Sequence, residues 1–125
     1  MSANTDLISQ FIGSFQDKDV DKILEYFTED AVYTNIPMDP PNRGKAEIRV
    51  ILEMFMGMAE AMEFVVHHQS ETADGVVMNE RSDRFFVNGQ WITLPVMGVF
   101  EIDNGKIKAW RDYFDLNQFT SQMAS

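Results

Sequence analysis

The chain has 125 residues, of which 45% are hydrophobic and 12% aromatic, and this composition predicts one compact domain over residues 1–125 with a hydrophobic core. Twenty Asp and Glu against 10 Lys and Arg give a formal net charge of −10, which disfavours binding to the phosphate backbone of a nucleic acid. The absence of cysteine excludes disulfides and thiolate chemistry. No apolar run reaches the roughly 20 residues of a membrane span and no signal peptide is apparent, so we expect a cytoplasmic protein that does not enter membranes.

Helical periodicity characterises the first half of the chain. Apolar residues recur at helical spacing over residues 7–15 and again over residues 20–27, which predicts two amphipathic helices. Residues 31–36 have the character of a short strand, and a proline-containing loop follows them. Gly44 then leads into a third amphipathic helix, whose apolar face we expect to point towards the core.

Strand-forming residues dominate the second half. The dipeptides Asn88-Gly89 and Asn104-Gly105 are typical of tight β-hairpin turns, and a short helix is predicted over residues 116–123. Helices followed by an antiparallel sheet indicate an α+β fold, and a strongly bent sheet wrapped over the helices would enclose an apolar interior. Four segments rich in β-branched and aromatic residues are predicted as strands: residues 63–69, 76–87, 90–101 and 106–114.

Three short polar segments within these strands are candidates for chemistry. Because strand side chains alternate, Arg81 and Asp83 share one face, about 7 Å apart along the strand. Asp112 shares a face with two large aromatic residues, which predicts a buried carboxylate that needs a partner. Tyr33 and Asn35 also share a face, and a phenol and an amide can together hold one water molecule. The alternatives are an exposed ion pair, a solvated aspartate and an ordinary core tyrosine.

The register of the two hairpins decides whether these faces converge. Ideal two-residue turns would pair Arg81 with Val96 and Asp112 with Met97, and neighbouring residues on a strand point to opposite faces. One extra residue is therefore needed to bring Asp112 beside Arg81. We expect a β-bulge around Pro95, or else an irregular turn in the last hairpin.

These segments, in this order and at this spacing, make the sequence resemble the limonene epoxide hydrolase family within the nuclear transport factor two-like and polyketide cyclase-like superfamily. The likeness begins near Leu7 and covers nearly the whole chain. It rests on Ile23-Leu24-Glu25-Tyr26-Phe27-Thr28-Glu29-Asp30, Tyr33-Thr34-Asn35-Ile36-Pro37, Glu80-Arg81-Ser82-Asp83, Gly98-Val99-Phe100, Gly105-Lys106-Ile107 and Trp110-Arg111-Asp112-Tyr113-Phe114-Asp115-Leu116.

The resemblance implies a fold and a catalytic set. The expected fold is α+β, with three N-terminal helices packed in a strongly curved, mostly antiparallel mixed six-stranded sheet that forms a cone around a deep apolar pocket. A homodimer is also expected. By similarity, Asp83 is the general acid, Asp112 is the base that takes a proton from water, Tyr33 and Asn35 hold that water, and Arg81 bridges the two aspartates. In an apolar pocket we expect the aspartates to share one proton.

The activity implied is hydrolysis of an apolar, cyclic or terpene-like epoxide to a vicinal diol by one-step general acid/base-assisted attack of water. The epoxide and water are the expected partners, with no metal and no other cofactor. The departures from the family fall in the loop of residues 38–43, around residues 87–90 and at wall positions, so they bear on the substrate. Candidate pocket residues are Met38, Met78, Leu94, Val96, Trp110 and Phe114, with Met97 as a further candidate.

Two other functions remain open at this point. A ketosteroid isomerase-like or polyketide cyclase-like enzyme on the same fold would use one acid/base residue and would not need an arginine between two aspartates. A non-catalytic domain could instead bind a small apolar ligand. The discriminating feature is whether Arg81 and both aspartates lie together in the pocket.

Overall fold

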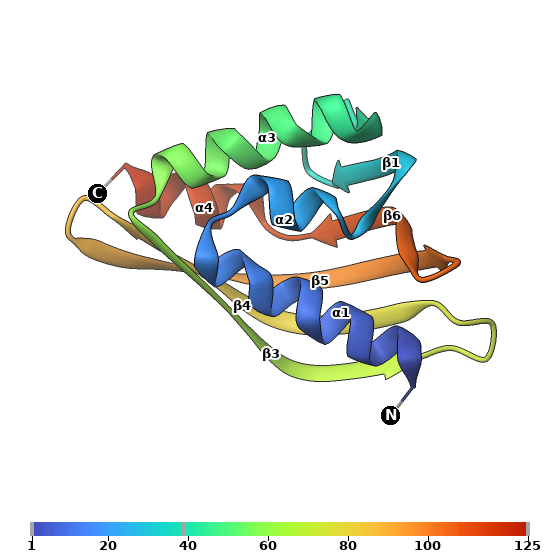
Figure 1. The fold of residues 1–125 in the computed structure, drawn as a ribbon. Coiled ribbons are helices and arrows are strands. Elements are labelled where there is room, and N and C mark those ends of the chain that lie inside the picture. The colour runs from blue at the N-terminus through green and yellow to red at the C-terminus, as the bar shows by residue number, and fades with distance from the viewer. Residues whose placement is uncertain (1, 39, 125) are drawn as a thin grey trace.

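A computed structural model describes residues 2–38 and 40–124 and has helices against one face of a curled sheet (Figure 1). The helices are α1 (Ala3–Ser14), the 3-10 turn η1 (Phe15–Asp17), α2 (Val20–Leu24), α3 (Gly44–Met58) and α4 (Leu116–Met123). The strands are β1 (Phe27–Asn35), β2 (Asn42–Arg43), β3 (Ala61–Glu71), β4 (Val77–Val87), β5 (Gln90–Asp103) and β6 (Lys106–Tyr113). Within the described ranges, no helix is long and apolar enough to cross a membrane.

The six strands form one mixed sheet in the order β2-β1-β6-β5-β4-β3. Only the β1–β6 pair is parallel among these neighbours, and the other four pairs are antiparallel. Helices α1, α2 and α3 precede most of the sheet in the chain and lie against its concave side (Figure 1). The predicted α+β fold, with three N-terminal helices and a curved six-stranded mixed sheet, is therefore confirmed.

Local capping and aromatic packing explain where the first helix sits. The Ser2 side chain accepts a hydrogen bond from the backbone N–H of Thr5, and the Thr5 side chain accepts one from the backbone of Ser2, which satisfies N-terminal donors of α1. On its inner face Phe11 is fully buried, and its ring meets those of Phe27 and Trp110 edge-on, at centroid distances of 5.4 and 5.0 Å. The helix thereby covers the strands that carry the polar side chains.

Two differences from the predicted elements lie between the second and the third helix. The second helix ends at Leu24 rather than at residue 27, because Phe27 is buried as the first residue of β1, which starts four residues earlier than expected. The short strand β2 lies in the segment predicted as a loop. Its two residues pair with Val32 and Tyr33, a contact between distant parts of the chain that local periodicity does not reveal.

The extra residue required by the register exists, but not where it was expected. Strands β4 and β5 pair without a shift, and Pro95 lies opposite Ser82, so the prediction of a bulge there is wrong. Pro95 is tolerated because β5 begins to pair with β6 only at Met97, which leaves one side of the strand as an edge at the proline. The turn of the last hairpin is also regular.

The bulge lies in β6. Ile102 pairs with Ile107 and the preceding Glu101 pairs with Ala109, so Lys108 is the additional residue. After Lys108, each side chain of β6 points to the opposite face of the sheet from the one it would face without the bulge. The bulge is therefore what turns Asp112 towards the concave face.

Deletion of Lys108 tests this conclusion. Removing the residue restores the ideal ladder and would turn Trp110 and Asp112 outwards, so we expect loss of cooperative unfolding or a large fall in Tm. Lys108 is exposed, and the control variant Lys108→Ala should change the free energy of unfolding by less than about 0.5 kcal/mol. Thermal unfolding followed by circular dichroism measures both. A deletion variant as stable as the wild type would contradict the role of the bulge.

Candidate active site

In the described part of the chain, five polar side chains are buried on the concave face of the sheet, and they belong to three strands. Arg81 and Asn79 are each 1% exposed, and the other three are no more than 5% exposed. Burial of so many polar groups is costly unless each one is paired. Four of the five residues had been predicted as site residues, and Tyr33 is buried beside them.

Arg81 lies between the two aspartates and holds both. Its Nε donates to Asp83 Oδ1 at 2.9 Å and its Nη2 donates to Asp83 Oδ2 at 2.8 Å, a bidentate pair. The same Nη2 donates to Asp112 Oδ2 at 2.8 Å. Burial opposes the charge on the guanidinium, but the charges of Asp112 and Asp83 more than offset it and raise the pKa of Arg81. The alternatives of an exposed ion pair and a solvated Asp112 do not apply.

Asp112 receives a second hydrogen bond, from the indole N–H of Trp110 to Oδ1 at 2.7 Å. Burial raises the pKa of Asp112 to about 6, and the charge of Asp83 adds to this, while the charge of Arg81 opposes it. One cation thus faces two carboxylates in a poorly solvated place. The pair therefore retains one proton at a pH at which isolated aspartates are fully ionised.

Tyr33 and Asn35 are brought to Asp112 by the parallel pairing of β1 with β6. Asn35 lies opposite Asp112 in the register, and Tyr33 lies opposite Trp110, with their rings stacked at 3.9 Å between centroids. The Tyr33 hydroxyl donates to Asn35 Oδ1 at 3.1 Å. Burial and the charge of Asp112 raise the pKa of Tyr33, so its phenol stays protonated as a hydrogen-bonding group.

Two further residues of the cluster were missed in the sequence. Asn79 Oδ1 accepts from Arg81 Nη1 at 3.0 Å, and the alternation Asn79-x-Arg81-x-Asp83 is the signal that would have found it. Gly98 lies opposite Asp112, and a Cβ at this position would be 2.4 Å from Arg81 Nη1 and 2.9 Å from Asp112 Oδ1. A glycine inside a strand is the signal of such a close approach.

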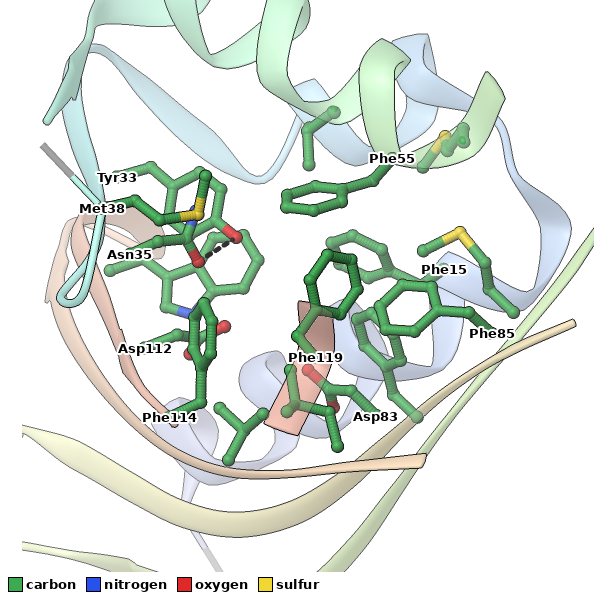
Figure 2. A pocket seen from close by; sticks show the side chains of 17 residues that line it. Phe15, Tyr33, Asn35, Met38, Phe55, Asp83, Phe85, Asp112, Phe114 and Phe119 are labelled. Carbon is green, nitrogen blue, oxygen red and sulfur yellow. Dashed lines mark hydrogen bonds between the residues drawn. The ribbon is translucent and has the colours of Figure 1, made fainter. Parts of the chain in front are cut away.

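A cavity opens next to this cluster, with Tyr33, Asn35 and Asp112 on one side and the carboxyl group of Asp83 pointing into it (Figure 2). It holds about 550 Å³ of space free of protein atoms, its opening to solvent included. Asn35, Asp83 and Asp112 are its polar lining residues, with the Tyr33 hydroxyl beside them. The other lining residues are aromatic, aliphatic or methionine: Phe15, Met38, Leu52, Phe55, Met56, Met62, Phe64, Phe85, Leu94, Val96, Trp110, Phe114 and Phe119.

Five of the six predicted pocket residues line this cavity, and one does not. Met78 points to the convex face of β4, with 36% of its surface exposed, because its neighbours in the strand, Val77 and Asn79, point inwards. Met97 is 45% exposed on the convex face of β5 for the same reason. The prediction that these two methionines line the pocket is therefore wrong.

The arrangement offers a shared proton and a carboxylate base facing one apolar space. Among residues 2–38 and 40–124, no cluster of three or more His, Asp or Glu side chains suits a metal ion. Asp83 and Asp112 instead each form an ion pair with the Arg81 guanidinium. Proton transfer at a polarised bond of an apolar ligand is the chemistry that such a pair can perform.

Gly98 gives a direct test of this packing. The variant Gly98→Ala should lose about 1–3 kcal/mol of unfolding free energy, because the methyl group would enter space held by the buried Arg81 guanidinium. The matched control is Gly57→Ala in α3, where an added Cβ meets nothing within 4 Å and should stabilise the helix by up to about 1 kcal/mol. Chemical denaturation measures both. Equal stability of Gly98→Ala and wild type would contradict the close approach.

Comparisons with known proteins identify the family. Residues 2–125 match the limonene-1,2-epoxide hydrolase (LEH) catalytic domain. The epoxide hydrolase EphG of Mycobacterium tuberculosis is 32% identical to the chain over 110 residues, which make up 87% of this chain and 71% of that protein.

Solved structures give the same picture of the fold. An LEH-like epoxide hydrolase of M. tuberculosis has a TM-score of 0.82 at 26% identity, over 98% of this chain and 90% of that one. A protein assigned as a SnoaL-like polyketide cyclase of Shewanella putrefaciens has a TM-score of 0.86 at 16% identity, over 99% and 98% of the two chains, a likeness of fold alone. Because the family domain matches residues 2–125 of the chain, the chain belongs to the limonene-1,2-epoxide hydrolase family.

Proposed function

We propose that the protein hydrolyses an apolar, cyclic or terpene-like epoxide to a vicinal diol by one-step attack of water. The observation that carries the proposal is the bridge formed by Arg81 Nη2, which is 2.8 Å from Asp83 Oδ2 and 2.8 Å from Asp112 Oδ2, at the wall of an apolar cavity. Epoxide opening near neutral pH needs a proton for the departing oxygen and a base for the attacking water. A pair of carboxyl groups that shares one proton supplies both.

Asp112 is the base in this proposal. Both of its oxygens accept hydrogen bonds from N–H groups, those of Trp110 and Arg81, and it lies opposite Asn35 in the neighbouring strand. Tyr33 and Asn35 lie beside it and orient the water. The water oxygen forms a bond to an epoxide carbon while one of its protons passes to Asp112.

Asp83 is the acid. Its carboxyl group points into the cavity (Figure 2), where it protonates the epoxide oxygen as the carbon–oxygen bond breaks. The products are a neutral diol, an ionised Asp83 and a protonated Asp112. Return of one proton from Asp112 to Asp83 restores the starting state, and Arg81 keeps both groups in place throughout.

The lining of the cavity supports an uncharged substrate. The Arg81 side chain is 0% exposed and does not line the cavity, so it offers no direct partner to a charged ligand. The remaining wall is aromatic, aliphatic or methionine. A substrate with a carboxylate or phosphate at its far end would leave that charge without a partner. The homodimer and the cytoplasmic location stay predictions.

Diol formation from a panel of cyclic, terpene-like and linear epoxides tests the proposal. Wild-type protein should convert members of the panel, whereas Asp112→Asn and Asp83→Asn should each lose at least about 100-fold in kcat, the contribution of a positioned acid or base. Gas chromatography of the diol measures turnover, and circular dichroism establishes that the variants are folded.

Turnover that survives both substitutions would show that the acid and base are other residues. Single turnover in ¹⁸O-labelled water distinguishes the route, because direct attack places solvent oxygen in the diol. Unlabelled diol from the first turnover would mean that an enzyme carboxylate attacks instead.

The pH dependence follows from the raised pKa of Asp112. That value, about 6, describes loss of the last proton of the pair, because the charge of Asp83 helps to raise it. The active form needs that proton, so kcat/KM should be highest below about pH 6 and fall about tenfold per pH unit well above it, as the fraction of the pair that carries the proton decreases. An apolar substrate displaces water and raises the pKa further, so the fall in kcat should lie at higher pH. A pH profile of both parameters checks this, and a kcat/KM that rises through pH 6 contradicts it.

A further inference from the structure

A chain of side-chain hydrogen bonds connects the guanidinium of Arg81 with helix α1. Arg81 Nη1 donates to Asn79 Oδ1 at 3.0 Å, and Asn79 Nδ2 donates to Gln69 Oε1 at 3.1 Å. Gln69 Nε2 in turn donates to the backbone oxygen of Thr5 at 3.2 Å and to Ser9 Oγ at 3.0 Å. The chain starts at a buried cation and ends on a helix on the concave side of the sheet.

The cation fixes the direction of every bond in this chain. A guanidinium only donates hydrogen bonds, so the oxygen of the Asn79 amide must face Arg81 and its nitrogen must face Gln69. Gln69 then has its oxygen towards Asn79 and its nitrogen towards α1, where a backbone carbonyl only accepts. All the donors point the same way, and bonds aligned like this strengthen one another.

Asn79 completes the set of partners that hold Arg81. Four of the five N–H groups of the guanidinium point at Asp83, Asp112 and Asn79. The first two partners are the reacting carboxyl groups, whose charges change during the proposed reaction. Asn79 is neutral and does not line the cavity, so its bond to Nη1 stays the same when the proton moves.

We propose that Asn79 is a positioning residue. It is anchored to α1 through Gln69, and it fixes the plane of the guanidinium so that Arg81 Nη2 reaches both aspartates. An aspartate at position 79 would have nearly the same shape but would add a third carboxylate around one cation. It would also place an oxygen opposite Gln69 Oε1. The guanidinium would then be drawn away from Asp112, and Asp112 would lose part of the effect that favours its ionised form.

The indole of Trp110 reports on Asp112 without any substrate. Its N–H donates to Asp112 Oδ1, so its NMR signal should move as Asp112 gains or loses its proton. The groups that face Asp112 are Arg81 and Asp83 from β4, together with Tyr33 from β1. The chain has two tryptophans, and the other, Trp91, is 42% exposed and stacks on Arg84 at 4.5 Å on the convex face, which makes it an internal control.

The experiment compares wild type with Asn79→Asp, Gln69→Ala and the control Asn88→Asp. Asn88 is exposed in a hairpin turn, so its substitution makes the same chemical change far from the cluster. In ¹H–¹⁵N spectra against pH, the Trp110 inflection should move upwards by about one unit or more in Asn79→Asp, as expected for a like charge nearby. It should move less in the same direction in Gln69→Ala and stay in place in Asn88→Asp.

Kinetics on the best epoxide substrate provide the second readout, and only this arm rests on the proposed function. We expect kcat of Asn79→Asp to fall at least tenfold with little change in KM, because Asn79 does not line the cavity, and the fall in kcat/KM should move to higher pH. Gln69→Ala should show a smaller loss of kcat. This second variant keeps the test valid if Asn79→Asp does not fold.

The outcomes separate the two proposals. A Trp110 inflection and a kcat that match the wild type in folded Asn79→Asp and Gln69→Ala, with only a lower Tm, would overturn the positioning role and leave the hydrolase function intact. A shifted Trp110 inflection in a protein that converts no epoxide of the panel would support the positioning of Arg81 and count against the proposed function.

Discussion

One buried cation held between two carboxylates determines most of the design of this domain. Arg81 has no exposed side-chain surface, and an ion in such a place is stable only when its partners satisfy it. Asp83 and Asp112 do so, but two ionised carboxylates against one guanidinium leave one negative charge in excess. An apolar surrounding disfavours that surplus charge, so the pair takes up a proton easily, as the raised pKa of Asp112 shows. A proton that is available near neutral pH is thus a consequence of how the cluster is buried.

The bridge also constrains the backbone beneath it. Arg81 and Asp112 lie on strands that flank β5, so they are separated by two inter-strand spacings, roughly 10 Å. The guanidinium has to cross the middle strand close to its surface, and any side chain there would block it. Gly98 leaves that path open, and the bulge at Lys108 turns Asp112 to the same face. A glycine and one additional residue, neither of them reactive, are therefore as necessary to the cluster as the charged groups.

Much of this could be predicted from the sequence, and the exceptions have a physical cause. Strand alternation is local, so it correctly placed Arg81 with Asp83 on one face, and hairpin arithmetic showed that one residue was missing from the ladder. Pro95 was a misleading signal for the position of that residue, because a proline is also tolerated where one side of a strand is unpaired, as β5 is at this point. The prediction for Met78 followed its hydrophobicity alone, whereas the same alternation places it on the face opposite to Arg81 and Asp83, which is the exposed face of β4. Asn79 was missed because a neutral amide carries no signal apart from its register.

The fold alone does not choose the reaction, since a polyketide cyclase-like protein shares it at 16% identity. The two carboxyl groups here differ in the hydrogen-bond partners of their oxygens. Asp83 has both oxygens on Arg81, whereas Asp112 has one oxygen on Arg81 and one on the Trp110 indole, with Asn35 opposite it in the neighbouring strand. A water held by the Asn35 amide and the Tyr33 phenol, as proposed, would therefore lie next to Asp112. In the proposed reaction, the asymmetry of these neutral neighbours is what assigns the base to Asp112 and the acid to Asp83.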